Sequence, residues 1–218
     1  MTEQLLSASV ASPPPALDSV INTLAEQGWV IDRSLFTPQD IALLCDECVQ
    51  HWRQGEFHEA AIGQASEQRR LSEIRSDSVL WLDEDNAPPA VAAYFAKLEQ
   101  IRQAVNQSLF MGLVELESHF AVFPTGAFYK NHLDRFRHDD ARTLSAVLYL
   151  NQDWPDDAGG EMRLYLDPEC QHHLDVAPQA GTLVLFLSDR FWHEVLPARQ
   201  PRLSITGWFR RHTGNVPW

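Results

Sequence analysis

The second half of the chain, from Gly112 onward, is a series of short segments in which apolar and polar residues alternate. Alternation with a period of two residues is typical of half-buried β-strands. Turn-forming sequences rich in Gly, Pro and Asp separate these segments, and many short strands joined in this way predict a sandwich or a jelly roll. The expected strands cover residues 114–123, 142–150, 161–166, 182–186 and 202–209.

The first half of the chain predicts helices instead. Thr37 fits a helix N-cap, Pro38 suits the first helical position, and Asp40 favours the positive end of the helix dipole. Further helices are expected over 18–26 and 89–106, with a short strand over 28–31. Helices that precede a run of strands pack on one face of a sheet. The fold class is therefore mainly β with N-terminal helices: a double-stranded β-helix (jelly roll) buttressed by helices.

The chain is long enough for one large domain. With 218 residues, of which 44% are apolar, it can bury a substantial core. We expect a single domain over 17–213, with helices and a polar connecting segment (55–73) in 17–110 and the strands in 111–211. A proline-rich N-terminal tail, 1–16, and a C-terminal tail, 212–218, flank it.

Charge and cysteine content narrow the function classes. A formal net charge of −13 offers no basic stripe that could neutralise phosphates, so nucleic acid is not an expected partner. The three cysteines make an odd count, which fits a reducing compartment. No apolar run approaches the length of a membrane span, and no signal peptide is visible. We expect a cytoplasmic protein without a membrane partner, and a monomer.

His132-Leu133-Asp134 fits either part of a metal site or a turn histidine capped by the nearby aspartate. Residues two apart in an extended segment point to the same side, so an imidazole and a carboxylate are presented together. His193 follows 61 residues later, at the start of another short strand. Two histidines and one carboxylate on one face of a metal leave positions open, which is the facial triad of non-haem Fe(II) oxygenases.

The last expected strand carries an unusual cation. Arg202 stands among apolar residues nine positions after His193, where it needs a buried anion. A dicarboxylate co-substrate would supply one through a bidentate contact.

Together these residues resemble the 2-oxoglutarate-dependent prolyl hydroxylases, and within them the oxygen-sensing (hypoxia-inducible-factor) type and its bacterial relatives. The likeness covers roughly residues 28–211. Besides the residues above, it includes Tyr149-Leu150-Asn151, Gly159-Gly160, Ser188-Asp189-Arg190, Ile74-Arg75-Ser76-Asp77 and Trp81.

The resemblance implies a role for each matching residue. His132, Asp134 and His193 would bind Fe(II). The distal carboxylate of 2-oxoglutarate would be held by Arg202 and Tyr149, with Val147 lining its pocket. Thr206 and Trp208 would line the metal cavity, and Tyr129 would replace a hydroxyl that the family has near Phe123. Asp77 and Arg142 would pair, beside Arg75, to support the substrate loop.

The resemblance also implies the reaction. Fe(II), 2-oxoglutarate and O2 would hydroxylate a proline of a cytosolic protein, with succinate and CO2 as products, ascorbate as a candidate cofactor and elongation factor Tu as a candidate substrate. The long 55–73 segment favours a protein substrate. Two alternatives are a small-molecule hydroxylase on the same scaffold and a non-catalytic jelly-roll module for binding or sensing.

Other candidate sites have simpler interpretations. Cys45, Cys48 and His51 make at most half of a zinc site, and the two cysteines fall on the apolar face of a helix, so core packing is expected. His138-Asp139-Asp140 is expected to be a loop rather than a second metal site, and His119 a structural residue of its strand.

Overall fold

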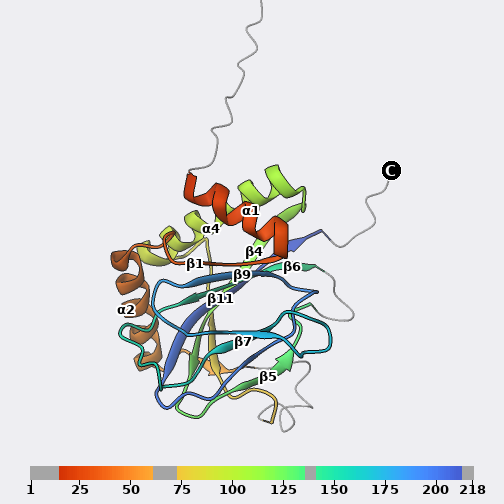
Figure 1. Ribbon diagram of the computed structural model, residues 1–218. Helices are drawn as coiled ribbons and strands as arrows, with labels where there is room; N and C mark the ends of the chain where they lie inside the picture. Colours follow the sequence, from red (N-terminus) through yellow and green to blue (C-terminus); the bar gives the residue numbers. More distant parts are fainter. Residues whose placement is uncertain (1–14, 61–72, 136–140, 213–218) are drawn as a thin grey trace, which may run out of the picture.

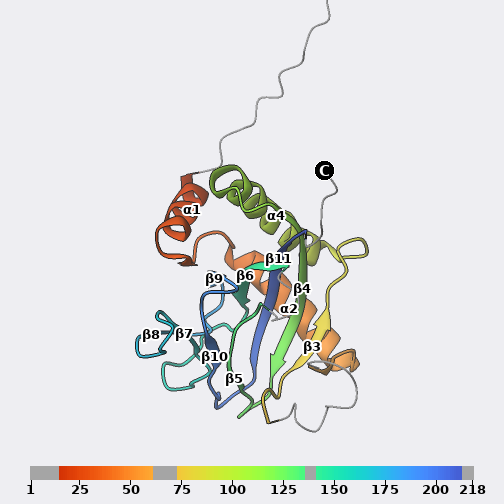
Figure 2. The same ribbon diagram turned by 90° about the vertical axis from the view of Figure 1, so that its right-hand side faces the viewer.

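Two antiparallel sheets face one another, and helices cover the outer face of the larger one (Figures 1 and 2). The computed structural model describes residues 15–60, 73–135 and 141–212. In chain order its elements are α1 (Pro15–Gln27), β1 (Trp29–Asp32), α2 (Pro38–Gln54), β2 (His58–Glu59), β3 (Ser78–Trp81), α4 (Pro89–Leu109), β4 (Leu113–Phe123), β5 (Tyr129–His132), β6 (Arg142–Tyr149), β7 (Met162–Tyr165), β8 (His173–Val176), β9 (Leu183–Leu187), β10 (His193–Val195) and β11 (Arg202–Arg211).

The strand order is that of the predicted jelly roll. The seven-stranded sheet runs β1-β9-β6-β11-β4-β3-β2, and the four-stranded sheet runs β5-β10-β7-β8. Strand β11 is central, because it pairs with β4 on one side and β6 on the other. In this register Thr206 lies opposite His119 of β4 and Val147 of β6. The fold class inferred from alternation is confirmed.

Alternation along the central strands separates two cores. On β6, Leu144, Ala146 and Leu148 pack with buried residues of the helices. The intervening residues Val147 and Tyr149 pack instead with β7, β8 and β9, in the space between the sheets. Because successive side chains of a strand point to opposite faces, one strand supplies both layers. Every second residue of β4, β6 and β11 is therefore available for a site between the sheets.

The predicted start of α2 is confirmed in detail. The hydroxyl of Thr37 accepts a hydrogen bond from the Asp40 amide at 3.2 Å, and the Asp40 carboxylate accepts from the Thr37 amide at 2.8 Å. This reciprocal arrangement is a capping box, which satisfies two backbone donors that the helix leaves free. At the other end, Gly55 ends the helix in the left-handed conformation with φ of 74°.

Three strands were not predicted as such. β2 and β3 are too short to show alternation, and they form because β3 pairs with β4 and β2 pairs with β3. β8 begins at His173 and is an edge strand of the smaller sheet, where it pairs with β7. The irregular segment expected over 55–73 therefore contains β2, while 61–72 lie outside the described residues.

The helices begin and end close to the expected positions. α1 starts at Pro15, inside the tail expected over 1–16; the remainder of that tail, and 213–218, lie outside the described residues. Both α1 and α4 extend a few residues beyond the ranges expected from apolar spacing. Within the described part of the chain, no helix is long and apolar enough to cross a membrane.

We predict that Thr37→Ala lowers the free energy of unfolding by about 1 kcal/mol, because alanine cannot accept the hydrogen bond from the Asp40 amide. Thr37→Ser, which keeps the hydroxyl, is the matched control and should stay close to the unsubstituted protein. Chemical denaturation of the three proteins measures the difference. Equal stability of the alanine and serine variants would contradict a stabilising role for the cap.

Candidate active site

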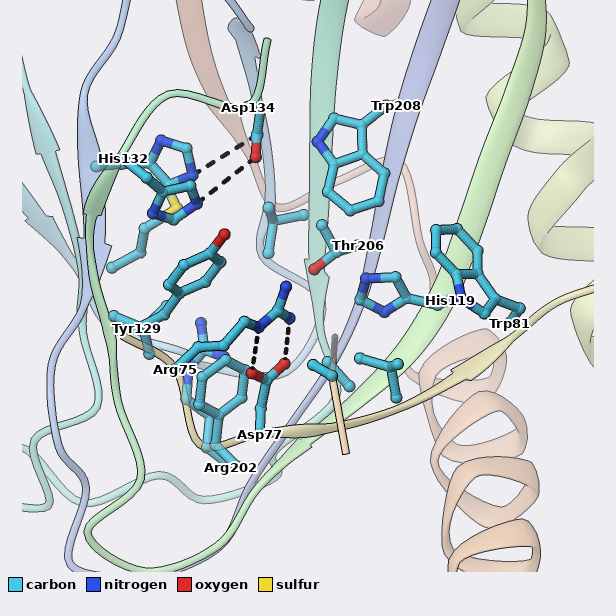
Figure 3. A pocket seen from close by; sticks show the side chains of 18 of the residues that line it. Arg75, Asp77, Trp81, His119, Tyr129, His132, Asp134, Arg202, Thr206 and Trp208 are labelled. Atoms are coloured by element: carbon cyan, nitrogen blue, oxygen red, sulfur yellow. Dashed lines mark hydrogen bonds and ion pairs between the residues drawn. The ribbon is translucent and has the colours of Figure 1, made fainter. Parts of the chain in front are cut away.

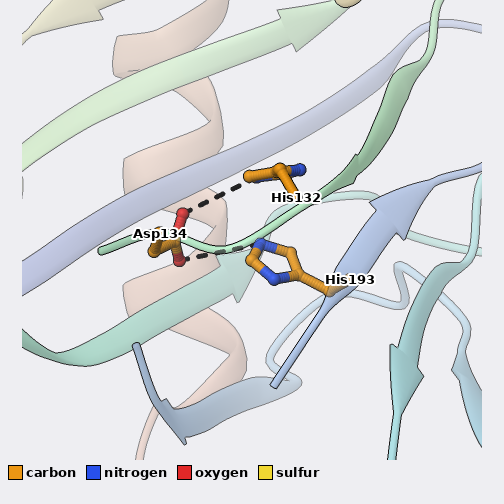
Figure 4. Close-up of side chains that lie close together, drawn as sticks. All are labelled: His132, Asp134 and His193. Atoms are coloured by element: carbon orange, nitrogen blue, oxygen red, sulfur yellow. Dashed lines mark ion pairs between the residues drawn. The ribbon is translucent and has the colours of Figure 1, made fainter. Parts of the chain in front are cut away.

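The two predicted histidines and the predicted aspartate meet at one end of the smaller sheet (Figure 4). His132 ends β5, His193 begins β10, and the two residues are cross-strand partners. Asp134 follows β5 and turns its carboxylate toward both rings: Oδ1 lies 3.7 Å from Nε2 of His132, and Oδ2 lies 3.6 Å from Nε2 of His193. One ligand atom from each residue falls within 4.8 Å of the others. Sequence positions 61 apart thus converge because β5 and β10 are neighbours.

Backbone carbonyls fix the ring orientation of both histidines. Nδ1 of His132 lies 2.8 Å from the Lys130 carbonyl, and Nδ1 of His193 lies 3.2 Å from the Phe191 carbonyl. A carbonyl only accepts, so in each neutral ring Nδ1 carries the proton and Nε2 keeps its lone pair. Both lone pairs face the carboxylate of Asp134. A histidine that binds a metal through Nε2 needs this tautomer. Here it is held by backbone carbonyls, which would not themselves be metal ligands.

Burial sets the charges at the site. Burial lowers the pKa of His193 to about 4, and the neighbouring His132 acts in the same direction. For Asp134, burial alone would raise the pKa, but His193, His132 and a hydrogen bond from Ser145 outweigh it, so the pKa lies below its usual range. At neutral pH His193 therefore offers a neutral imidazole and Asp134 an ionised carboxylate, the forms that bind a divalent cation.

A cavity of about 260 Å³ opens beside these three residues (Figure 3). It lies between the sheets and is walled by the inward-facing residues of β4 and β11. The structure brings together at its lining nearly all of the residues predicted for the site: Arg75, Asp77, Tyr129, His132, Asp134, Arg142, Val147, His193, Arg202, Thr206 and Trp208. Tyr149 lies behind this lining, with its ring 4.9 Å from the Arg202 guanidinium.

Arg202 is a buried cation at the inner end of the cavity. Its side chain is 2% exposed and lies between the rings of Phe123 and Tyr149, each 4.9 Å away. Burial lowers the pKa of Arg202, since the charged form loses its hydration. Nε of Arg202 and the hydroxyl of Tyr149 have no hydrogen-bond partner among the described residues. Two orphaned donors in a closed space fit the carboxylate of a small dicarboxylic acid such as 2-oxoglutarate.

The expected pairing of Asp77 with Arg142 is wrong. Asp77 accepts two hydrogen bonds from Arg75, at 2.7 and 2.6 Å. Arg142 instead pairs with Glu117 at 2.7 Å and stacks its guanidinium 3.6 Å above the Trp208 ring. Arg75 is the closer partner because it lies only two residues before Asp77 in the sequence.

His119 lies on its expected strand, β4, and it also lines the cavity. It is 3% exposed and lines the cavity, between Trp81, with ring centroids 5.1 Å apart, and Trp208, 5.4 Å apart. A signal was present in the sequence: His119 shares the alternation of Ala121 and Phe123, which face the cavity from the same strand. Trp81, which the resemblance singled out, closes the same wall.

The cysteines of the possible zinc site lie in the core. Cys48 is fully buried in the helix-side core and Cys45 packs against it, as expected. His138-Asp139-Asp140 lies outside the described residues. Within the described residues, the cluster that could hold a metal ion is that of His132, Asp134 and His193.

Comparison with known proteins shows which families and structures this chain is similar to. Residues 118–210 match the 2OG-Fe(II) oxygenase superfamily. The chain is 43% identical to a Pseudomonas putida prolyl-4-hydroxylase, with a TM-score of 0.81 over 90% of this chain and 100% of that one. It is 25% identical to a Trichoplax adhaerens prolyl hydroxylase, solved in complex with a hypoxia inducible factor oxygen degradation domain peptide fragment, with a TM-score of 0.79 over 89% of this chain and 88% of that one.

Two animal proteins are longer relatives. The Caenorhabditis elegans hypoxia-inducible factor prolyl hydroxylase is 27% identical over 88% of this chain and 28% of its own length. The human Egl nine homolog 1 is 27% identical over 63% of this chain and 33% of its own length. The chain thus spans about a third of the length of these two relatives.

We predict that the metal-free protein loses stability as the pH falls from about 6.5 to about 4. Burial lowers the pKa of both His119 and His193 from 6.5 to about 4, so in this window the unfolded chain binds protons that the folded chain does not. His119→Gln should make the slope of unfolding free energy against pH shallower. His172→Gln, at an exposed side chain, is the matched control and should leave the slope unchanged. An unchanged slope in His119→Gln would contradict the effect of burial on His119.

Proposed function

We propose that this chain, which belongs to the prolyl hydroxylase family of 2-oxoglutarate- and Fe(II)-dependent oxygenases, hydroxylates a proline residue in a protein substrate. As a member of that family it is an enzyme that needs Fe(II), 2-oxoglutarate and O2. The main support for the proposal is that two buried donors, Nε of Arg202 and the hydroxyl of Tyr149, have no hydrogen-bond partner among the described residues, and that Arg202 lines the same cavity as the His-Asp-His cluster. A module that only binds a metal has no use for such an anion site, which argues against a non-catalytic role.

The proposed roles follow from the geometry. His132, Asp134 and His193 would hold the iron, the two rings through the Nε2 atoms that face the Asp134 carboxylate and the aspartate through that carboxylate. Arg202 and Tyr149 bind the distal carboxylate of 2-oxoglutarate and thereby aim its keto acid end at the metal. When bound, Fe(II) with 2-oxoglutarate and O2 supplies the oxidant that converts a C–H bond to C–OH, with succinate and CO2 as the other products.

Tyr129 is proposed to donate a hydrogen bond inside the cavity. Its hydroxyl points into the space between Arg75 and Asp134 (Figure 3). Burial raises the pKa of Tyr129 to about 12, so the phenol keeps its proton at neutral pH. Its ring stacks on His132, with centroids 3.6 Å apart and planes 15° apart, which also limits rotation of that imidazole. Tyr129 thus supplies the hydroxyl that Phe123 lacks.

The substrate is proposed to enter the cavity past Trp81 and Trp208. Trp81 is 49% exposed, while Trp208 and His119 behind it are buried. Together they give an apolar, aromatic surface that suits the flat pyrrolidine ring of proline. The nearest support for a protein rather than a free amino acid is the Trichoplax relative, which was solved with a peptide fragment. A cytosolic protein, with elongation factor Tu as the first candidate, is the proposed substrate.

The experiment is a comparison of substrates. The enzyme with Fe(II) and 2-oxoglutarate is incubated with host protein extract, with purified elongation factor Tu and with free prolyl metabolites, and each is analysed by mass spectrometry. The proposal predicts a gain of one oxygen atom on a proline within a protein, absent when 2-oxoglutarate is omitted. Oxidation of a free metabolite alone would assign the chain to small-molecule hydroxylation instead.

We predict that Arg202→Ala weakens the apparent affinity for 2-oxoglutarate by on the order of 2–5 kcal/mol, because the carboxylate loses its charged partner. Tyr149→Phe removes one hydrogen bond and should cost about 0.5–1.5 kcal/mol. The KM for 2-oxoglutarate, from succinate formation, measures both.

Arg163→Ala is the control for loss of an arginine, since Arg163 pairs with Asp175 on two neighbouring strands outside the cavity. It should leave the KM unchanged. If Arg202→Ala also leaves it unchanged, the co-substrate is anchored elsewhere.

A further inference from the structure

Two buried serines stand behind the proposed iron ligand Asp134. Ser145 belongs to β6, and Ser188 follows the last residue of β9; both are fully buried. Oγ of Ser145 lies 2.6 Å from Oδ2 of Asp134 and 2.9 Å from Oγ of Ser188. The three side chains form a line that leads from the strand connection to the carboxylate.

The direction of the hydrogen bonds along this line follows from donor counting. Ser145 donates its single hydroxyl proton to Oδ2 of Asp134. Ser145 then has only lone pairs left for Ser188, which must be the donor in the second hydrogen bond. The chain therefore runs Ser188 to Ser145 to Asp134, and each bond polarises and strengthens the next.

Ser188, at the other end of this hydrogen-bonded chain, is held by backbone hydrogen bonds. The Ser188 amide donates to the Thr143 carbonyl at 3.1 Å, and the Ser188 carbonyl accepts from the Arg135 amide at 3.2 Å. Arg135 also pairs with Asp189 at 2.6 Å. The strand connection therefore holds both the backbone next to Asp134 and, through two hydroxyls, its side chain.

We propose that Ser188 and Ser145 are positioning residues that hold the Asp134 carboxylate, through its Oδ2 atom, in the orientation that faces Nε2 of both histidines. This inference rests on the proposed iron site. Without these hydrogen bonds the carboxylate could rotate away from the two rings, and it would then bind a divalent cation less tightly.

The test measures metal binding rather than turnover. Mn(II), which binds without oxidising, is titrated into metal-free protein, and Ser145→Ala should raise the Kd about 10- to 100-fold, the usual effect of removing a group that orients a ligand. Ser188→Ala should raise it less, because Ser145 still reaches the carboxylate. Adding Ser188→Ala to Ser145→Ala should have no further effect, since Ser188 acts only through Ser145.

Ser118→Ala is the matched control. Ser118 is also a buried strand serine with a hydrogen-bonded hydroxyl, but its partner is Tyr94 and not a proposed ligand. It should leave the Kd unchanged. Thermal unfolding of each variant tests whether it folds; should Ser145→Ala not fold, the Kd of Ser188→Ala decides, and a rise supports the proposal.

Three results of the Mn(II) titration would each contradict a different part of the proposal. A Kd in Ser145→Ala within about twofold of the unsubstituted protein, far below the usual effect, would reduce the serine pair to core packing. Independent, additive effects of the two substitutions would contradict the proposed order of the chain. Failure of the unsubstituted protein to bind Mn(II) at all would overturn the iron site itself, and with it the proposed function.

Discussion

The two-residue alternation of β4, β6 and β11 is the constraint on which the site depends. These strands lie side by side, so their inward residues form one continuous wall and their outward residues form the bed for the helices. Leu148 and Ile205 belong to the helix-side core, while Val147 and Thr206 line the cavity. A shift of register by one residue in β11 would move Arg202 to the helix side and a leucine into the cavity. Apolar packing against the helices therefore fixes the position of the polar groups.

The polar groups of this wall are of two kinds: some already have a hydrogen-bond partner in the protein, and others have a free donor that a ligand could satisfy. Ser145 and Ser188 satisfy one another and Asp134, whereas Arg202 and Tyr149 keep donors without partners among the described residues. Since a buried charge without a counterion is costly, a bound carboxylate such as that of 2-oxoglutarate would stabilise the second pair. The groups of the metal cluster already have partners: the rings of His132 and His193 are oriented by backbone carbonyls, and the carboxylate of Asp134 accepts a hydrogen bond from the Ser145 hydroxyl.

Local pattern was enough to predict most of the fold, because alternation predicted the long strands. The site needed the resemblance to a known family as well, which placed His132, Asp134, His193 and Arg202 together. Short strands such as β2 and β3 escaped, because pairing with β4 and with each other, rather than their own sequence, makes them strands. The partner of Asp77 was wrong, because the nearer Arg75 takes its carboxylate. The role of Ser145 was missed because which hydroxyl reaches a carboxylate depends on the register between strands distant in sequence.

The most direct test of the account is anaerobic binding of Fe(II) and 2-oxoglutarate, followed by the visible charge-transfer absorption that the keto acid gives when it chelates Fe(II). The account predicts that the band appears with one iron per chain and is absent from Asp134→Ala, whose circular dichroism should still be that of the folded protein. A band of equal strength and affinity in Asp134→Ala would contradict the assignment of His132, Asp134 and His193 as the iron site.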